Sequence, residues 1–180
     1  IQPLVRSGVV EDWSCTKRIK LVNTGTIDPF RLKWGEQDIS FLGYKGRYPI
    51  LDASHLKEHY PRRYQQAEHM TVAIAGLSNR IEAAVLPKGV MSGVATVLLQ
   101  PNEGVCPYAL TALLNSQAYS DLYKGLFGMS GMTADILNYS SKPMGYLPIP
   151  GELKRYSPEG RLSQLGQQLH HSLRLAKPEN

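Results

Sequence analysis

The hydrophobic pattern of this 180-residue chain changes at Pro107, and this change constrains the fold more than any other feature. Before Pro107, apolar residues gather in short runs between turn residues, a pattern typical of β-strands. After it, apolar residues recur at the spacing of helices that bury one face. The sequence therefore predicts an α+β fold, with a β-rich lobe over residues 1–105 and a helical segment over residues 106–180 that packs on it.

The β-rich part is expected to contain a hairpin. Met70–Ala75 and Ile81–Leu86 are strand candidates, and the segment Gly76–Arg80 between them has a length that suits a hairpin loop. Lys17–Val22 is an earlier strand candidate and Val94–Leu99 a later one. These runs predict several short strands before residue 105.

Two segments between those strands have other patterns. Phe41–Tyr48 mixes glycines with aromatic and basic residues, which predicts a loop or an irregular strand edge. Asp52–Ala67 predicts a helix, because Asp52 or Ser54 can cap its first turn. Pro61 falls inside this run and predicts a break there.

From Pro107 onward the pattern predicts helices. A helix beginning at Pro107 would present one apolar stripe, formed by Leu110, Leu113, Leu114, Ala118, Leu122 and Leu126. Phe127–Met132 predicts a loop, followed by a short turn or strand toward Pro150. Ser157-Pro158-Glu159 predicts the start of a C-terminal helix over about 157–176, with leucines spaced by three and four.

Composition indicates a globular protein, since 42% of the residues are hydrophobic and 19% are charged. The formal net charge of +5 modestly favours polyanionic partners. Cys15 and Cys106 lie far apart and form no metal-type pair. A disulfide between them is conceivable, but only two cysteines in a chain of this size favour a reducing compartment. No signal peptide or membrane-length apolar run is visible. We expect a cytoplasmic protein without a membrane partner. Because the chain begins at Ile1 and not at Met, we also expect it to be a piece of a longer protein.

Motifs for catalysis are few. His55 and His59 fit the H-x-x-E-H pattern of inverted zinc peptidases, in which two imidazoles lie one helical turn apart. Pro61 follows two residues after His59 and interrupts the helix, so a solvated helix face is the favoured interpretation and no metal is expected. A metal-dependent hydrolase that uses His55 and His59 is the alternative. No G-x-S-x-G elbow and no phosphate-cradling glycine motif occurs.

Three segments together resemble the C-terminal target-recognition domain of type II DNA adenine methyltransferases. They are Ala73–Gly89 (AIAGLSNRIEAAVLPKG), Ala109–Asp121 (ALTALLNSQAYSD) and the exit Leu147–Pro150. In that family a β-rich lobe is followed by a helix with a Leu-Asn-Ser turn, a loop and a Pro-Ile-Pro-like exit. The order matches over roughly residues 20 to 150, and the chain is more distantly similar to type I specificity subunits.

The resemblance implies sequence-specific recognition of double-stranded DNA for a restriction–modification or phage-defence methyltransferase. The methylation motif Asn/Asp-Pro-Pro-aromatic is absent; Cys106-Pro107-Tyr108 is its nearest approach and has one proline. We therefore expect a non-enzymatic recognition part with no cofactor of its own. The parent protein, a methyltransferase with or without endonuclease activity, would bind S-adenosylmethionine. Its methyltransferase domain, in the same polypeptide or complex, would be a partner beside DNA.

Residue chemistry predicts which side chains contact DNA. Arginine can form two hydrogen bonds with guanine, and asparagine can form two with adenine. Lysine and arginine contacts to phosphates fix the position of the protein along the duplex. The candidates combine these chemistries with turns or aromatic neighbours: Tyr44, Lys45, Arg47, Arg62, Arg63, Ser78, Asn79, Arg80 and Lys88. By contrast, Asn115 and Ser116 are expected to satisfy backbone groups in the core.

A further alternative is a protein-interaction module. The C-terminal helix presents leucines at helical spacing, and such a stripe can dock a partner. In that case loss of Arg47, Arg63 and Arg80 should leave binding unaffected.

Overall fold

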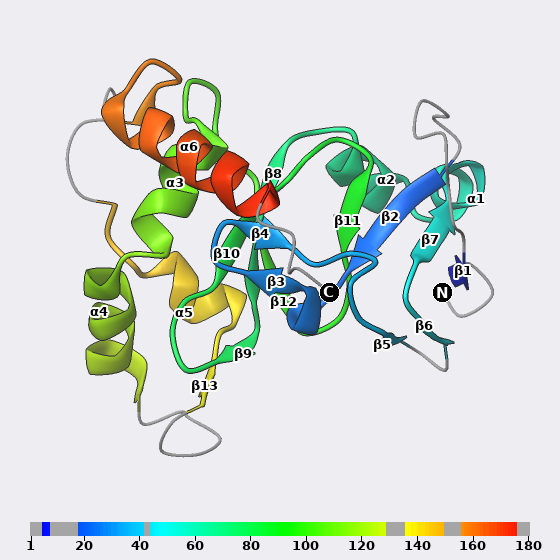
Figure 1. The fold of residues 1–180 in the computed structure, drawn as a ribbon, viewed down its shortest axis with the longest axis horizontal. Coiled ribbons are helices and arrows are strands. Elements are labelled where there is room, and N and C mark those ends of the chain that lie inside the picture. The colour runs from blue at the N-terminus through cyan, green and yellow to red at the C-terminus, as the bar shows by residue number, and fades with distance from the viewer. Residues whose placement is uncertain (1–4, 8–17, 42–43, 129–135, 150–155, 176–180) are drawn as a thin grey trace.

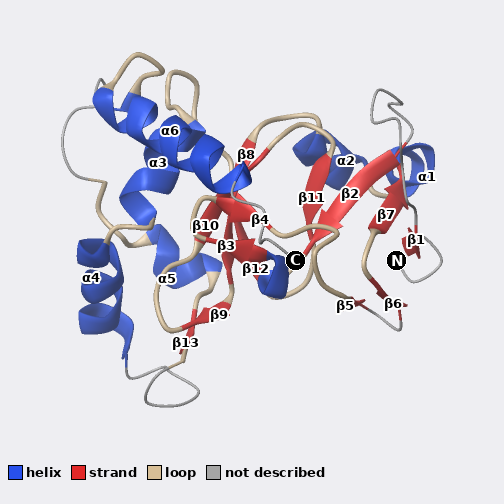
Figure 2. Ribbon diagram, in the orientation of Figure 1, coloured by secondary structure: helices blue, strands red, loops and turns tan. Residues whose placement is uncertain are grey.

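The computed structural model describes residues 5–7, 18–41, 44–128, 136–149 and 156–175. These residues form small sheets and helices, so the predicted α+β class is confirmed (Figures 1 and 2). In the part of the chain that is described, no helix is long and apolar enough to cross a membrane.

The first sheet has the order β1-β7-β2-β11. Its strands are β1 (Val5–Ser7), β2 (Arg18–Val22), β7 (Pro49–Asp52) and β11 (Val90–Ser92). β2 pairs antiparallel with β7 and parallel with β11. The prediction of a strand at Lys17–Val22 is thus confirmed over the described residues, whereas β11 was not predicted.

Two helices follow β7 and pack on this sheet: α1 (Ala53–His59) and α2 (Pro61–Ala67). The Asp52 side chain accepts a hydrogen bond from the His55 N–H and caps α1. Pro61 starts α2, so the predicted break within the helical run is confirmed.

The second sheet has the order β10-β8-β12. It consists of β8 (Thr71–Ala75), β10 (Ala83–Leu86) and β12 (Thr96–Leu99). The predicted hairpin is confirmed, because β8 and β10 pair antiparallel with Ala83 opposite Ile74. β12 begins later than predicted, because Val94 is exposed and Ala95 adopts a positive φ of 56°. All residues of β8 and β10 are buried, since helices cover one face and the β2 side of the molecule covers the other.

The helical segment contains α3 (Pro107–Leu114), α4 (Gln117–Phe127), α5 (Ser141–Gly145) and α6 (Arg161–Leu175). The prediction of one continuous stripe from Pro107 to Leu126 was wrong. The helix ends at Leu114, because Asn115 bonds to the backbone of β10 and Ser116 caps α4 through the Tyr119 N–H. Leu126 is consequently 55% exposed.

Short ribbons complete the fold. They are β3 (Ile27–Asp28) with β4 (Arg31–Leu32), β5 (Ile39–Phe41) with β6 (Tyr44–Gly46), and β9 (Leu77–Ser78) with β13 (Leu137–Asn138). Part of the segment Phe41–Tyr48, which was predicted to be a loop or an irregular strand edge, therefore forms strand β6 of a hairpin. Toward Pro150 the chain forms β13 and then α5, where only a turn or strand was predicted.

Along the chain most strands precede residue 105 and the longer helices follow it, but packing groups the elements differently. The β10-β8-β12 sheet shares a core with α3 and α4, whereas the β2 sheet packs with α1 and α2. Figure 1 shows the two groups side by side with the β3–β4 hairpin between them. Cys106 is buried and free; Cys15 and residues 129–132 of the predicted loop lie outside the described residues.

Candidate nucleic-acid interface

The β9–β13 ribbon presents polar side chains beyond the end of the β8–β10 hairpin. Leu77 lies opposite Asn138, and Ser78 lies opposite Leu137. The Ser78 hydroxyl donates to the Arg80 carbonyl and closes the turn. Asn79, Arg80 and Asn138 are exposed, so one arginine and two carboxamides face solvent on the same ribbon.

This ribbon is firmly attached to the core. The Gly76 N–H donates to the Ala95 carbonyl at 2.8 Å, and the Tyr139 N–H donates to the Gly76 carbonyl at 2.8 Å. A Cβ at Gly76 would overlap the Ala95 carbonyl, so this position needs glycine. On the β13 side, the Tyr123 hydroxyl donates to the Asn138 carbonyl at 2.9 Å. The exposed side chains are therefore presented from a fixed backbone.

The Leu-Asn-Ser turn fastens the helices to the strand that follows this ribbon. The Asn115 carboxamide accepts from the Ala83 N–H at 2.8 Å and donates to the Ala83 carbonyl at 2.9 Å. The Ser116 hydroxyl donates to the Leu113 carbonyl at 2.7 Å. The prediction that Asn115 and Ser116 are structural is confirmed.

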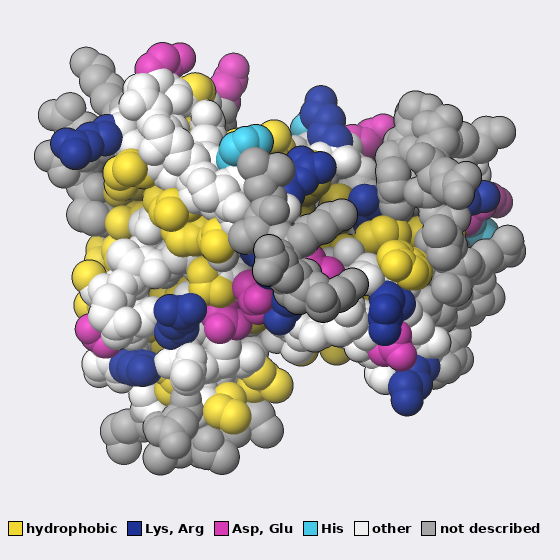
Figure 3. All heavy atoms as spheres, in the orientation of Figure 1, with side chains coloured by type: hydrophobic (Ala, Val, Ile, Leu, Met, Phe, Trp, Pro, Cys, Tyr) yellow, Lys and Arg dark blue, Asp and Glu magenta, His cyan; other side chains and the backbone are white. Residues whose placement is uncertain are grey.

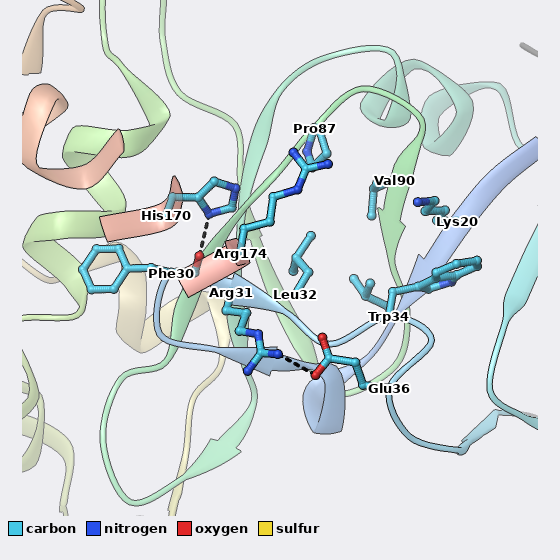
Figure 4. A pocket seen from close by; sticks show the side chains of 11 residues that line it. Lys20, Phe30, Arg31, Leu32, Trp34, Glu36, Pro87, Val90, His170 and Arg174 are labelled. Atoms are coloured by element: carbon cyan, nitrogen blue, oxygen red, sulfur yellow. Dashed lines mark hydrogen bonds and ion pairs between the residues drawn. The ribbon is translucent and has the colours of Figure 1, made fainter. Parts of the chain in front are cut away.

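A concave site of about 200 Å³ lies where the two groups of elements meet (Figure 4). β2, the β3–β4 hairpin, the β10–β11 turn and the last turns of α6 form its walls. Its lining combines apolar and basic side chains: Lys20, Val22, Phe30, Arg31, Leu32, Trp34, Glu36, Pro87, Val90, His170 and Arg174. Glu36 is the only acid among these described lining residues. We call this site the basic groove.

The lining of the basic groove contains more basic than acidic side chains. Burial, and next the nearby Arg174 charge, lower the pKa of Lys20, whose Nζ lies 4.6 Å from the centre of the Trp34 ring. Arg31 is paired with Glu36 at 2.8 Å. His170 Nδ1 lies 2.5 Å from the Phe30 carbonyl oxygen, and burial lowers the pKa of this imidazole. Such a concentration of cations suits an anionic ligand.

The ribbon and the basic groove are connected through one short turn. The Leu77 N–H in β9 donates to the Thr24 hydroxyl at 3.4 Å, and Thr24 begins the 3-10 turn η2 (Thr24–Thr26) before β3. The exposed polar side chains after β9 and the elements of the basic groove are thus linked by a direct hydrogen bond.

The predicted DNA contacts occupy different environments. Asn79, Arg80 and Lys88 are exposed, Asn79 and Arg80 at the ribbon and Lys88 in the turn between β10 and β11. Arg62 is exposed on α2. The ribbon residues Ser78–Arg80 are a compact group, whereas Arg62 belongs to the β2 side of the molecule.

Two predicted arginines have partners. The Arg63 guanidinium donates to the Ser92 carbonyl at 2.7 Å and to the Gln66 carboxamide at 2.9 Å, and its burial lowers its pKa. It therefore ties α2 to β11. Arg47 lies 3.6 Å from Asp38, and both side chains are about half exposed. Lys45 is exposed on β6, and Tyr44 is the preceding residue of the same strand.

Sequence reasoning missed Asn138, His170 and Arg174. Asn138 comes beside β9 through a long-range strand pairing that no local pattern indicates. His170 and Arg174 belong to a helix with basic residues and no acid, and that signal could have identified them. The rings of His55 and His59 do lie 4.2 Å apart. Over the residues that the structure describes, however, no group of three His, Cys, Asp or Glu could hold a metal ion.

In comparisons with known proteins, no protein-family model and no curated protein matches this chain.

Proposed function

We propose that this chain recognises a specific sequence in double-stranded DNA for a restriction–modification or phage-defence adenine methyltransferase. The observation that supports this most is the β9–β13 ribbon, which presents Asn79, Arg80 and Asn138 from a fixed backbone beside the basic groove. Two-stranded ribbons are one of the elements that enter a DNA groove.

The ribbon side chains have the chemistry of base recognition. An arginine guanidinium can donate two hydrogen bonds to a guanine, and an asparagine carboxamide can donate to and accept from an adenine. Arg80 and Asn79 would supply one of each, and Asn138 a second carboxamide. The recognised sequence should therefore contain G·C and A·T pairs within the reach of one short ribbon.

Phosphate contacts would come from cations of the basic groove and of the adjoining β10–β11 turn. Arg174 lines the basic groove, and Lys88 is exposed in the turn that follows Leu86 and Pro87. Such contacts release counterions, so affinity should fall steeply as the salt concentration rises.

The chain would read DNA without methylating or cutting it. The catalytic motif and the S-adenosylmethionine site would belong to a methyltransferase domain of the same polypeptide or complex. Adenine methylation requires the target base to be rotated out of the duplex. The recognition part would hold the surrounding base pairs during that rotation.

A selection from a random duplex library at about 150 mM salt, where non-specific phosphate binding is weakened, tests this proposal. We expect enrichment of one short motif. Equal affinity for all duplexes, or no binding even at low salt, would reject sequence-specific recognition.

A further inference from the structure

Helix α6 carries a row of three leucines that are partly exposed to solvent. Leu165 and Leu169 are each 43% exposed and Leu173 is 36% exposed. Their spacing of four residues places them on one face of the helix. Single exposed leucines are common, but a contiguous apolar row marks an interaction surface. Figure 3 shows a band of hydrophobic side chains in the region of α6 and α3.

The face of α6 that packs on the molecule adjoins the leucine row. At Gly166 a Cβ would overlap the Tyr108 carbonyl, which shows that the α6 and α3 backbones pack directly together. The Ser163 side chain is fully buried and donates to the Ser157 carbonyl at 2.5 Å. His170 contacts the Phe30 carbonyl. Gly166, Ser163 and His170 therefore attach α6 to the fold beside the leucine row, whose side chains remain 36–43% exposed.

The charge of α6 indicates what would cover the leucine row. Between Arg161 and Leu175 the helix contains arginine and histidine but no aspartate or glutamate. Arg161 and His171 are exposed. An acidic flank on a partner would be attracted to this helix, whereas a basic flank would be repelled.

We propose that the Leu165–Leu169–Leu173 face of α6 binds an amphipathic helix whose apolar stripe is flanked by Asp or Glu. A helix laid against a helix buries both apolar rows and leaves the charges at the rim. A second copy of this chain fits less well, because a symmetric pairing of two α6 helices would bring only basic side chains together. The surface goes beyond DNA recognition and does not depend on it.

Two synthetic peptide probes test the charge preference on the unmodified chain. Both have about three heptads with leucine at the a and d positions, one with glutamate and one with lysine at the e and g positions. Fluorescence anisotropy of labelled peptide should show that the glutamate peptide binds at least about tenfold more tightly at low salt. Equal binding of both peptides, or no binding of either, would overturn the proposal.

A leucine variant tests whether the glutamate peptide binds at the Leu165–Leu169–Leu173 face. Leu165→Ser with Leu169→Ser should weaken binding of the glutamate peptide about tenfold or more, while the denaturation midpoint stays near that of the parent chain. Leu126→Ser on α4 is the matched control, because Leu126 is 55% exposed and lies on another helix. Unchanged peptide binding in the double variant would place the contact elsewhere.

Sedimentation over a range of protein concentrations tests whether a second copy of this chain occupies the leucine face instead. A dimer that disappears in the Leu165→Ser, Leu169→Ser variant would assign the face to a second copy and overturn the proposal. The expected result is a monomer at all concentrations. None of these measurements contains DNA, so the failure of one proposal is distinguishable from the failure of the other.

Discussion

The α3–α4 junction and the β9–β13 ribbon contain similar residues with opposite roles. At the junction, Asn115 exchanges two hydrogen bonds with the backbone of Ala83. At the ribbon, Asn79 is exposed, and its side chain forms no hydrogen bond with the described residues. A carboxamide that completes buried backbone bonds is part of the architecture, whereas one left in solvent on a fixed ribbon is available for a ligand.

The same contrast separates two arginines. Arg63 is half-buried and bonded to the Ser92 carbonyl, so its guanidinium holds α2 against β11. Arg80 is exposed, and its guanidinium has no ion pair with the described residues. Substitution of Arg63 should therefore affect folding, and substitution of Arg80 should affect binding.

The largest effect is expected for Asn115→Ala. Loss of the carboxamide leaves the buried Ala83 N–H without its acceptor, which should lower the free energy of unfolding by about 2–3 kcal/mol. Urea denaturation followed by circular dichroism measures this. Asn79→Ala is the control and should leave the midpoint unchanged; similar midpoints for both variants would contradict the comparison.

Gly76→Ala should have the next largest effect. The added Cβ would overlap the Ala95 carbonyl at the base of the ribbon, which should destabilise the chain by about 2 kcal/mol. Thermal denaturation checks this against Gly125→Ala, because a Cβ at Gly125 meets no atom within 4 Å. Equal melting temperatures for the two variants would show that the ribbon base tolerates a side chain.

Alanine substitution of Arg80 and of Arg63, each in turn, tests the contrast between a binding and a structural arginine. Arg80→Ala should weaken binding to the preferred duplex by about tenfold and leave the unfolding midpoint unchanged. Arg63→Ala should lower the midpoint, because the Ser92 carbonyl is left without its donor. The two readouts are anisotropy with labelled duplex and urea denaturation. A stability loss confined to Arg80→Ala would reverse the assignment.

The smallest effect is the pH dependence at His170. Burial lowers the pKa of His170 below the ordinary value of 6.5, so the unfolded chain takes up this proton first as the pH falls. The stability contributed by neutral His170 is full above about pH 6.5 and is lost progressively below it. Melting temperatures from pH 7.5 to 5.5 should fall more for the parent chain than for His170→Gln. Parallel curves would show that His170 does not contribute.

Local patterns predicted the α+β class, the β8–β10 hairpin and the break at Pro61, because each depends on residues close together in the chain. The break after Leu114 was missed even though a structural role for Asn115 was predicted. The apolar spacing continues across this point, and the helix ends because Asn115 bonds to Ala83 in β10 and Ser116 caps α4.

The site was predicted in part. Asn79 and Arg80 lie at a turn, where local chemistry identifies exposed polar groups. Their neighbour Asn138 depends on strand pairing across a long sequence separation, and the basic groove depends on α6 meeting β2 and the β3–β4 hairpin. Arg63 was included as a DNA contact because a sequence does not show which cations are buried; its hydrogen bonds give it a structural role.

Base reading by the β9–β13 ribbon is tested most directly by the duplex selection repeated with Arg80→Ala and Lys88→Ala. Both residues are exposed cations, but only Arg80 lies in the turn that directly follows β9. Arg80→Ala should lose the preference at one base pair of the enriched motif, whereas Lys88→Ala should bind the same motif more weakly with a smaller salt dependence. If Arg80→Ala selects the parent motif with the same preference at every position, the ribbon does not read DNA.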